Sequence, residues 1–284
     1  MTREAPLLVM HNLPPDALVD AHVHTLASDG MLTLRQLANL AKRSGLSAFV
    51  PCDHDVVHDA ADLEDAGKSA NVLALSGVEL TTSFGDRTLH LLGYGFDLAD
   101  ATLLDACRRR QEIRRKRFMA MADALRRRSI KLDPRKLERI LACKAPGRRH
   151  LARELVADRA APSIRIAFQR FLNGVDYGFV DDDPLPIASA ISILHAAGGK
   201  AVLAHPPANL LVDEWRALVD SALDGIEGDY PSLVKSHRRF LQERGAEYGL
   251  QTTAGSDYHG DEPRDCLGGK TMTWKSWKAL INHT

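Results

Sequence analysis

The segment 20–30, DAHVHTLASDG, places two histidines two residues apart at the end of an apolar run that begins at Leu18. Side chains two apart on a β-strand point to the same side, so His22 and His24 share one face. Asp29 follows in a small polar turn. Two imidazoles and a nearby carboxylate are part of the ligand set of a transition-metal ion, although a histidine pair alone is also compatible with a structural role. The segment therefore predicts half of a metal site.

The composition excludes several classes of protein. The 284 residues are 45% hydrophobic with a net charge of +0, which suits one large domain and argues against a surface wholly dedicated to nucleic acid. No apolar run has the length of a membrane span, and the N-terminal residues lack the apolar core of a signal peptide. The four cysteines form no CxxC pair. We therefore expect a cytoplasmic protein with reduced thiols and no membrane partner.

The charges are divided unevenly along the chain. Residues 97–180 hold 21 Lys and Arg against 10 Asp and Glu, whereas the remainder holds 16 basic and 27 acidic residues. This division predicts a carboxylate-rich centre that faces a basic module able to attract anions.

Strands and helices alternate on both sides of the basic segment, which favours an α/β barrel with its site at the strand ends. Residues 97–180 are helical in pattern, and the arginines of their longest helix are expected mostly on a solvated face. We expect a barrel of residues 1–96 and 181–284, with 97–180 as a basic helical insertion that covers the substrate. The predicted strands are 46–51, 72–80, 88–95, 200–205, 225–227 and 250–254, and the predicted helices are 33–44, 59–70, 103–128, 137–143, 150–160, 164–172, 186–197, 214–223, 232–245 and 271–283.

Nine imidazole and carboxylate side chains lie at or near strand ends, more than one zinc ion needs. Imidazole and carboxylate without thiolate suit Mn, Fe or Zn, and a bridging carboxylate suits a cluster of two or three divalent ions. Such a cluster makes a hydroxide nucleophile at neutral pH and holds the oxygens of a phosphoryl group. The nine predicted ligands are His22, His24, Asp29, His54, Glu79, His90, His205, Asp257 and His259.

These residues form an ordered motif series: HVH with SDG, then DHD, GVE, a strand histidine, AHP and GSDYH. The series resembles that of the polymerase and histidinol phosphatase (PHP) family over residues 20–260. The resemblance implies a distorted (β/α)7 TIM-like barrel with a trinuclear metal centre. The nucleotide phosphatase and 5′-3′ exoribonuclease subgroup is the most similar, since its members carry a helical insertion after the strand histidine.

The resemblance also implies roles for the ligands. A hydroxide between the first two ions would attack phosphorus in line with the leaving alcohol, and Asp53 would orient a ligand imidazole. Glu227 ends a strand on the same face, where a similar supporting role is expected. The implied sets are His22, His24, Glu79 and Asp257 for the first ion, Glu79, His90 and His205 for the second, and Asp29, His54 and His259 for the third.

Residues 147–153, GRRHLAR, are similar to a subgroup motif, TRGHFAR, whose Arg and His bind the substrate phosphate. Arg148 and His150 would do so here, although an ordinary helix start is the alternative. Asp176 stands where the subgroup often has Lys, and Ala208 where it usually has Arg. We therefore expect poorer binding of a second phosphate or a polynucleotide, and predict a nucleoside monophosphate or related sugar phosphate as substrate.

Two other functions stay open. A 5′-3′ exoribonuclease of the same family is favoured by the arginine-rich insertion, so RNA is an alternative partner. A metal-bound module that serves a partner protein without catalysis is disfavoured by the complete ligand set. Cys52 is expected to be a buried thiol. His58, His195 and His237 are expected to be structural or surface groups.

Overall fold

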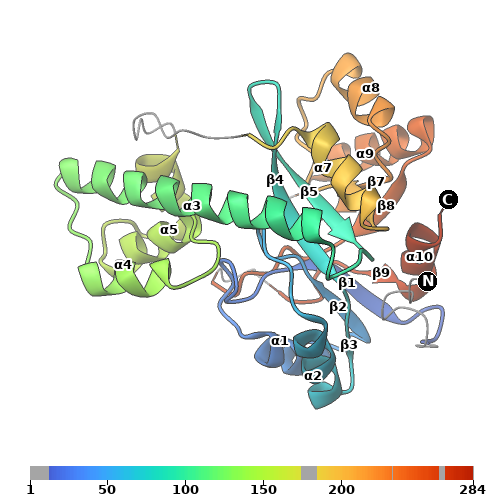
Figure 1. Ribbon diagram of the computed structural model, residues 1–284, viewed down its shortest axis with the longest axis horizontal. Helices are drawn as coiled ribbons and strands as arrows, with labels where there is room; N and C mark the ends of the chain where they lie inside the picture. The colour runs from blue at the N-terminus through green and yellow to red at the C-terminus, as the bar shows by residue number, and fades with distance from the viewer. Residues whose placement is uncertain (1–12, 174–183, 232, 262–265, 284) are drawn as a thin grey trace.

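The computed structural model describes residues 13–173, 184–231, 233–261 and 266–283 (Figure 1). Their strands pair in a four-stranded sheet, in the order β3-β2-β1-β9, and a five-stranded sheet, in the order β4-β5-β6-β7-β8. Isolated bridges join the two sheets between Val23 and Tyr258 and between His54 and Glu79. The predicted α/β fold is therefore confirmed, and within the described residues it consists of two bridged open sheets.

The smaller sheet is built around the strand of the HVH motif. β1 (Leu18–Val23) pairs in parallel with β2 (Ala48–Pro51), and β2 pairs in parallel with the short β3 (Leu73–Ala74). β9 (Met272–Thr273) pairs antiparallel with the other edge of β1. All residues of β1 after the first are buried, so both faces of this strand lie inside the protein.

The larger sheet contains one reversed strand. β4 (Gly77–Phe84) and β5 (Arg87–Tyr94) form an antiparallel hairpin, and β5 is also antiparallel to β6 (Lys200–Leu203). β6, β7 (Gly225–Asp229) and β8 (Gln251–Ala254) are parallel to one another. Because β5 runs opposite to both neighbours, the end of β6 lies beside the middle of β5, where Leu203 pairs with Leu91.

The prediction of one strand at 72–80 is wrong, because this stretch divides into β3 and β4 in different sheets. The Leu75 N–H still bonds to Phe49 of β2, whereas Gly77 already pairs with Tyr94 of β5. Gly77 crosses so close to β2 that a Cβ there would lie 2.4 Å from Val50 Cγ1. A continuous apolar run gives no sign of such a change of partner.

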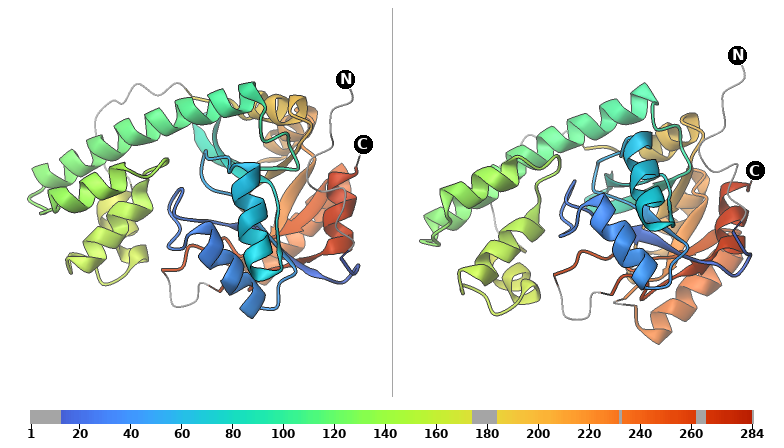
Figure 2. Two further views of the ribbon diagram at one scale, coloured as in Figure 1. Left: turned by 60° about the horizontal axis from the view of Figure 1, so that its bottom comes forward. Right: turned by 90° about the horizontal axis from the view of Figure 1, so that it is seen from below.

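Helices lie around the two sheets (Figure 2). Thr33 caps the first helix by accepting a hydrogen bond from the Gln36 N–H at 3.2 Å. Leu194, Trp215 and Leu241, from three different helices, pack in the core of the larger sheet. The helices are α1 (Leu34–Arg43), α2 (Ala60–Ala70), α7 (Ile187–Ala196), α8 (Val212–Asp220), α9 (Lys235–Tyr248) and α10 (Trp274–Ile281).

The helices between β5 and α7 form an arm that extends to one side of the sheets (Figure 1). The long α3 begins in the core of the larger sheet, where Leu103 and Cys107 are buried. Its far half packs into a separate core that includes Phe118, Leu125 and Leu151. The arm consists of α3 (Ala101–Arg127), α4 (Pro134–Leu141), α5 (Arg148–Ala157), α6 (Ile164–Ala167) and the π-helical turn η2 (Phe168–Leu172).

None of the helices in the described part of the chain has both the length and the apolar character that crossing a membrane requires.

Candidate metal centre

The strand ends bring the nine predicted ligands together from distant segments. His90 reaches the common edge because β5 is reversed, and its carbonyl accepts a hydrogen bond from the Ala204 N–H, just past β6, at 3.0 Å. The contacts below show that all nine lie in one cluster. They come from β1 and the turn after it (His22, His24, Asp29), the end of β2 (His54), β4 (Glu79), β5 (His90), the end of β6 (His205) and the loop after β8 (Asp257, His259).

Glu79 lies at the centre of the cluster and is 1% exposed. Its Oε2 lies 2.7 Å from His54 Nδ1 and 3.5 Å from His24 Nε2. Its Oε1 lies 2.8 Å from His90 Nδ1 and 3.0 Å from His205 Nε2. The two oxygens of one carboxylate therefore face two different sets of imidazoles, as a carboxylate shared between two ions must.

Three groups of side chains have ligand atoms within 4.8 Å of one another. In the group around Asp29, Oδ1 lies 3.3 Å from His259 Nε2 and Oδ2 lies 3.7 Å from His54 Nε2. Each group offers the three or more nitrogen and oxygen atoms that a divalent ion needs. The groups are His22, His24 and Asp257; His54, Glu79 and His90; and His24, Asp29, His54 and His259.

Two buried atoms of the cluster make no hydrogen bond. Glu79 Oε2 and His54 Nδ1 lie 2.7 Å apart, but neither has a hydrogen-bond partner among the described residues. Leaving buried polar atoms unsatisfied is costly, and an ion bound to both atoms would remove that cost. Together with a donor set of imidazole and carboxylate, these two atoms fit a bound divalent metal ion.

Glu227 contacts two of the predicted ligands. Its Oε1 lies 2.9 Å from His22 Nδ1, and both side chains are fully buried. This contact favours the tautomer with the hydrogen on Nδ1, which leaves the Nε2 of His22 free to bind an ion. Glu227 Oε2 accepts a hydrogen bond from the backbone N–H of His205 at 2.8 Å.

Asp53 contacts the turn before Asp29, and the orientation of a ligand imidazole that the resemblance implied for it stays a prediction. It accepts hydrogen bonds from the N–H groups of Thr25 (2.9 Å) and Ser28 (3.1 Å), in the turn that precedes Asp29. His58 Nε2 lies 2.6 Å from Asp53 Oδ2, which gives this histidine a structural contact. Burial raises the pKa of Asp53, but His58 outweighs burial and keeps the pKa below its usual range.

The backbone is strained at two predicted ligands. His205 and Asp257 have φ angles of 28° and 47°, in the left-handed region that residues other than glycine seldom adopt. Such strain costs on the order of 1–3 kcal/mol and occurs mainly at functional sites. The fold therefore holds both residues in conformations that cost stability, which is typical of residues at functional sites.

The charge states of the cluster differ from one predicted ligand to another. Burial raises the pKa of Glu79 and of Asp29, but the imidazoles around each carboxylate outweigh burial and keep both pKa values below their usual range. Burial lowers the pKa of His54 to about 4, so this imidazole is neutral at pH 7. Anionic carboxylates and neutral imidazoles are the forms that bind metal. Burial also lowers the pKa of His22, His205 and His259, but the carboxylates around them outweigh burial. They raise the pKa of His205 to about 9 and the pKa values of the other two above the usual range, so bound ions would displace protons from these three imidazoles.

The predicted phosphate-binding residues lie at the start of α5. The exposed guanidinium of Arg148 lies 5.7 Å from the centroid of the Phe168 ring, and His150 Nδ1 accepts a hydrogen bond from the Gly147 N–H at 3.1 Å. Their role in binding phosphate stays a prediction. Ala208 is exposed in the loop after β6, and Asp176 lies outside the described residues.

The remaining singled-out residues have ordinary contacts. Cys52 is fully buried, and its thiol donates to the Ala21 carbonyl at 3.4 Å. His195 lies 2.7 Å from an oxygen of Asp224, and His237 lies 3.1 Å from the carbonyl of Pro206.

The sequence pattern does not identify Arg114 as a largely buried cation beside the cluster. Arg114 Nε donates to Asp55 Oδ2, and its Nη2 donates to Thr81 Oγ1, each at 2.5 Å. Asp55 directly follows the ligand His54. The prediction of a solvated face is wrong for Arg114, whose side chain is 13% exposed. A run of arginines does not reveal which member is buried, and the second Asp of the DHD motif is the only hint of a partner.

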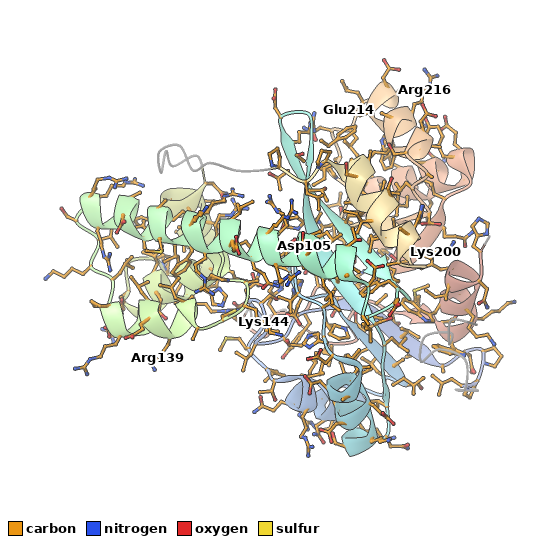
Figure 3. The ribbon with its side chains drawn as sticks, in the orientation of Figure 1. Asp105, Arg139, Lys144, Lys200, Glu214 and Arg216 are labelled. Carbon is orange, nitrogen blue, oxygen red and sulfur yellow. The ribbon has the colours of Figure 1, made fainter. Side chains whose placement is uncertain are left out.

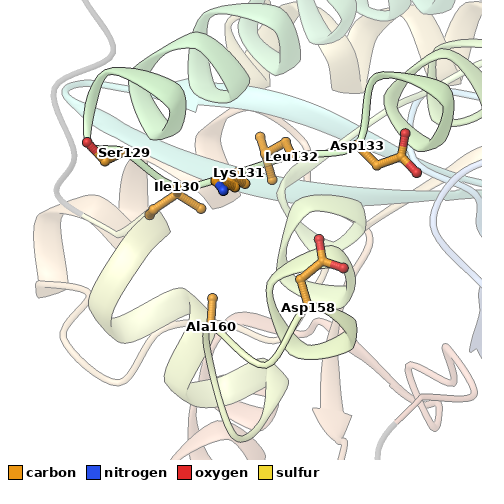
Figure 4. A pocket seen from close by; sticks show the side chains of 7 residues that line it. All are labelled: Ser129, Ile130, Lys131, Leu132, Asp133, Asp158 and Ala160. Atoms are coloured by element: carbon orange, nitrogen blue, oxygen red, sulfur yellow. The ribbon is translucent and has the colours of Figure 1, made fainter.

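A pocket of about 540 Å³ lies in the arm, away from the predicted ligands (Figure 4). It opens between the end of α3, the start of α4 and the end of α5. None of its lining residues belongs to the candidate metal centre. They are Ser129, Ile130, Lys131, Leu132, Asp133, Asp158 and Ala160.

Known proteins resemble the chain along most of its length, although no protein-family model matches it. A 5′-3′ exoribonuclease of Haemophilus influenzae is 31% identical over 247 residues, 84% of this chain and 89% of that protein. A 3′,5′-nucleoside bisphosphate phosphatase of Chromobacterium violaceum is 28% identical over 264 residues, 88% of this chain and 90% of that protein.

A solved structure shares the fold. The crystal structure of a protein from Bifidobacterium adolescentis, described as a metal-dependent phosphoesterase, superposes with a TM-score of 0.84 at 24% identity, over 94% of this chain and 96% of that one. The sequence relatives, the shared fold and the three groups of ligand atoms agree with the motif series. The chain therefore belongs to the PHP-like family of metal-dependent phosphoesterases, enzymes that hydrolyse phosphoric esters.

Proposed function

We propose that the chain is a metal-dependent phosphatase that removes phosphate from a nucleotide or a related sugar phosphate. The observation that carries the proposal is the position of Glu79, whose two oxygens face separate sets of imidazoles. The nine clustered side chains would hold two to three ions of Mn, Fe or Zn, and Glu79 would be shared between two of them. Ions of this kind activate water and neutralise phosphate oxygens.

The exposure of the ligands defines the side from which a substrate enters. The side chains of His90, His205 and Asp257 are 24%, 33% and 35% exposed, whereas those of Asp29 and His259 are 7% and 5% exposed. A phosphate group would therefore reach the centre beside the first three residues.

Residues 97–180 would serve as a basic insertion that attracts and covers the anionic substrate. Their separate hydrophobic core supports this division of the chain. The two sheets would be the two parts of a distorted (β/α)7 barrel, and the isolated bridges between them support that interpretation.

The proposed substrate class rests on two cations of the subgroup that the sequence lacks. Asp176 and Ala208 leave this chain without two cations that the subgroup often carries, which favours a monophosphate over a bisphosphate. A 5′-3′ exoribonuclease activity is the second candidate, and the 31% identical relative that carries this name favours it. The two candidates differ in whether the chain shortens RNA.

A panel of substrates tests the proposal. Protein loaded with Mn²⁺, or with Fe²⁺ under exclusion of air, would be assayed for phosphate release from 5′-, 3′- and 2′-nucleoside monophosphates, a 3′,5′-bisphosphate, sugar phosphates and a short 5′-phosphorylated RNA. We expect one monophosphate to be preferred. His205→Ala should abolish release, and Arg148→Ala should weaken it. Faster shortening of RNA would favour the exoribonuclease, and no release from any substrate by the metal-loaded protein would contradict both.

A further inference from the structure

Three charged side chains outside the predicted ligand set connect α5 to the loop after β8. Arg149 donates to both oxygens of Asp261, with Nη2 2.7 Å from Oδ1 and Nε 3.1 Å from Oδ2. Arg153 Nε donates to Oδ2 at 2.5 Å. The side chains of Arg149, Arg153 and Asp261 are only 21%, 16% and 7% exposed. Such charge-assisted contacts, one of them bidentate, are stronger than neutral hydrogen bonds. These three residues are called the Asp261 cluster below.

The Asp261 cluster lies directly beside the group of Asp29, His54 and His259. Arg153 Nη2 donates to the backbone carbonyl of Asp29. Asp261 follows His259 by two residues in the same loop. The cluster therefore holds the backbone of one predicted ligand directly and the loop of another through Asp261.

Two members of this group, Asp29 and His259, lie outside the strands of the sheets. His22, Glu79 and His90 lie within strands, whereas Asp29 and His259 lie in loops. Two backbone hydrogen bonds connect these loops, from the Met31 N–H to the His259 carbonyl and from the His24 N–H to the Tyr258 carbonyl, each at 2.9 Å. Ligands on loops are placed accurately only where other groups hold the loops, and the Asp261 cluster supplies such a hold from α5.

We propose that Arg149, Arg153 and Asp261 are positioning residues for the metal subsite of Asp29, His54 and His259, so that this subsite binds its ion tightly only while α5 is docked. The inference rests on the metal centre of the proposed function. The helical arm then completes one of the metal subsites, in addition to covering the substrate.

Titration of metal-free protein with Mn²⁺, with free Mn²⁺ measured by electron paramagnetic resonance, tests the inference without an activity assay. We expect three ions per wild-type chain. Asp261→Asn and Arg153→Met should each weaken one ion by about 10- to 100-fold, the usual effect of losing a group that orients metal ligands, and leave the other two ions unchanged. Asp29→Ala should remove the same ion. In the double variant that also carries Asp261→Asn, the affinities of the two other ions should then be the same as in Asp29→Ala alone.

Arg139→Gln is the matched control, because it removes one positive charge from the same arm. Arg139 is exposed on α4 and points away from the sheets (Figure 3). Its replacement should leave all three affinities unchanged. If either Asp261→Asn or Arg153→Met fails to fold, as judged by circular dichroism, Arg149→Met replaces it.

The outcomes separate this inference from the proposed function. Three ions of unchanged affinity in folded variants of the Asp261 cluster would overturn the inference and leave the phosphatase proposal standing. Only two ions in the wild-type protein would also overturn it, since the subsite in question would not exist. No bound ion in the wild-type protein would contradict the proposed function itself.

Discussion

Glu79→Gln is expected to lower phosphate release by more than about 100-fold. Removing a group that only orients a metal ligand costs less, about 10- to 100-fold. Glutamine keeps the size of the side chain but replaces one anionic oxygen with an NH₂ group that cannot bind a metal ion. That NH₂ group would take the place of Oε1, which lies 2.8 Å from His90 Nδ1, or of Oε2, which lies 2.7 Å from His54 Nδ1. Phosphate release and bound metal per chain, measured together, check this result.

Two other glutamates provide graded controls for this variant. Glu227→Gln alters a residue that orients His22 without facing the centre of the cluster, so we expect a loss of about 10- to 100-fold with most metal retained. Glu243→Gln changes an exposed glutamate that is paired with Arg239 on α9, and it should leave activity unchanged. Equal effects of Glu79→Gln and Glu227→Gln would contradict a bridging role for Glu79.

Arg114→Met is expected to lower the free energy of unfolding by about 3–5 kcal/mol, because it leaves the buried carboxylate of Asp55 without its cation. Asp55 is fully buried and Arg114 is 13% exposed. The same change should reduce activity, since Asp55 follows His54 and Thr81, the other partner of Arg114, lies two residues from Glu79. Denaturant unfolding and metal content check the two parts of this prediction.

Arg109→Met is the control on the same helix. Arg109 pairs with Asp105 at 2.9 Å, but the two side chains are 68% and 44% exposed (Asp105 is labelled in Figure 3). Exposed pairs contribute about 0–1 kcal/mol, so this variant should unfold almost as the wild type does. Similar losses of unfolding free energy in the two variants would show that the pair of Asp55 and Arg114 contributes no more to stability than an exposed pair does.

The pH dependence of Arg114→Met has a definite sign. Burial raises the pKa of Asp55, but the charge of Arg114 outweighs burial and keeps the pKa below its ordinary value of 3.8. A carboxylate with a lowered pKa in the folded state adds stability above its unfolded pKa and loses it as the pH falls. In the variant, burial without Arg114 would leave the pKa of Asp55 raised, so the stability difference between the two proteins should begin to shrink above pH 3.8 and go on shrinking as the pH falls.

The sequence grouped the candidate ligands more fully than it predicted the strands that carry them. Spacing placed His22 and His24 on one face, and the structure brings the nine candidates into one cluster, whose role as metal ligands stays a prediction. The reversal of β5, which takes His90 to the common edge, depends on pairing between distant strands and leaves no local pattern. The division of 72–80 between two sheets was hidden for the same reason.

The supporting residues were harder to predict because their partners lie far away in the sequence. Arg114 and Asp55 are 59 residues apart, and Arg149 and Asp261 are 112 residues apart. In a helix rich in arginine, the buried and exposed members look alike. Asp53 could be singled out from its motif, but its contacts with the turn before Asp29 depend on how two loops pack together.

Anomalous diffraction from crystals grown with Mn²⁺ would test the central claim most directly. Data collected on both sides of the manganese absorption edge locate each ion without assumptions about activity. We expect two or three peaks among the nine side chains, one of them bound by Glu79 together with His90 and His205, and a neighbouring peak on the other oxygen of Glu79. A single peak elsewhere on the chain, or no peak near Glu79 at saturating Mn²⁺, would contradict that expectation.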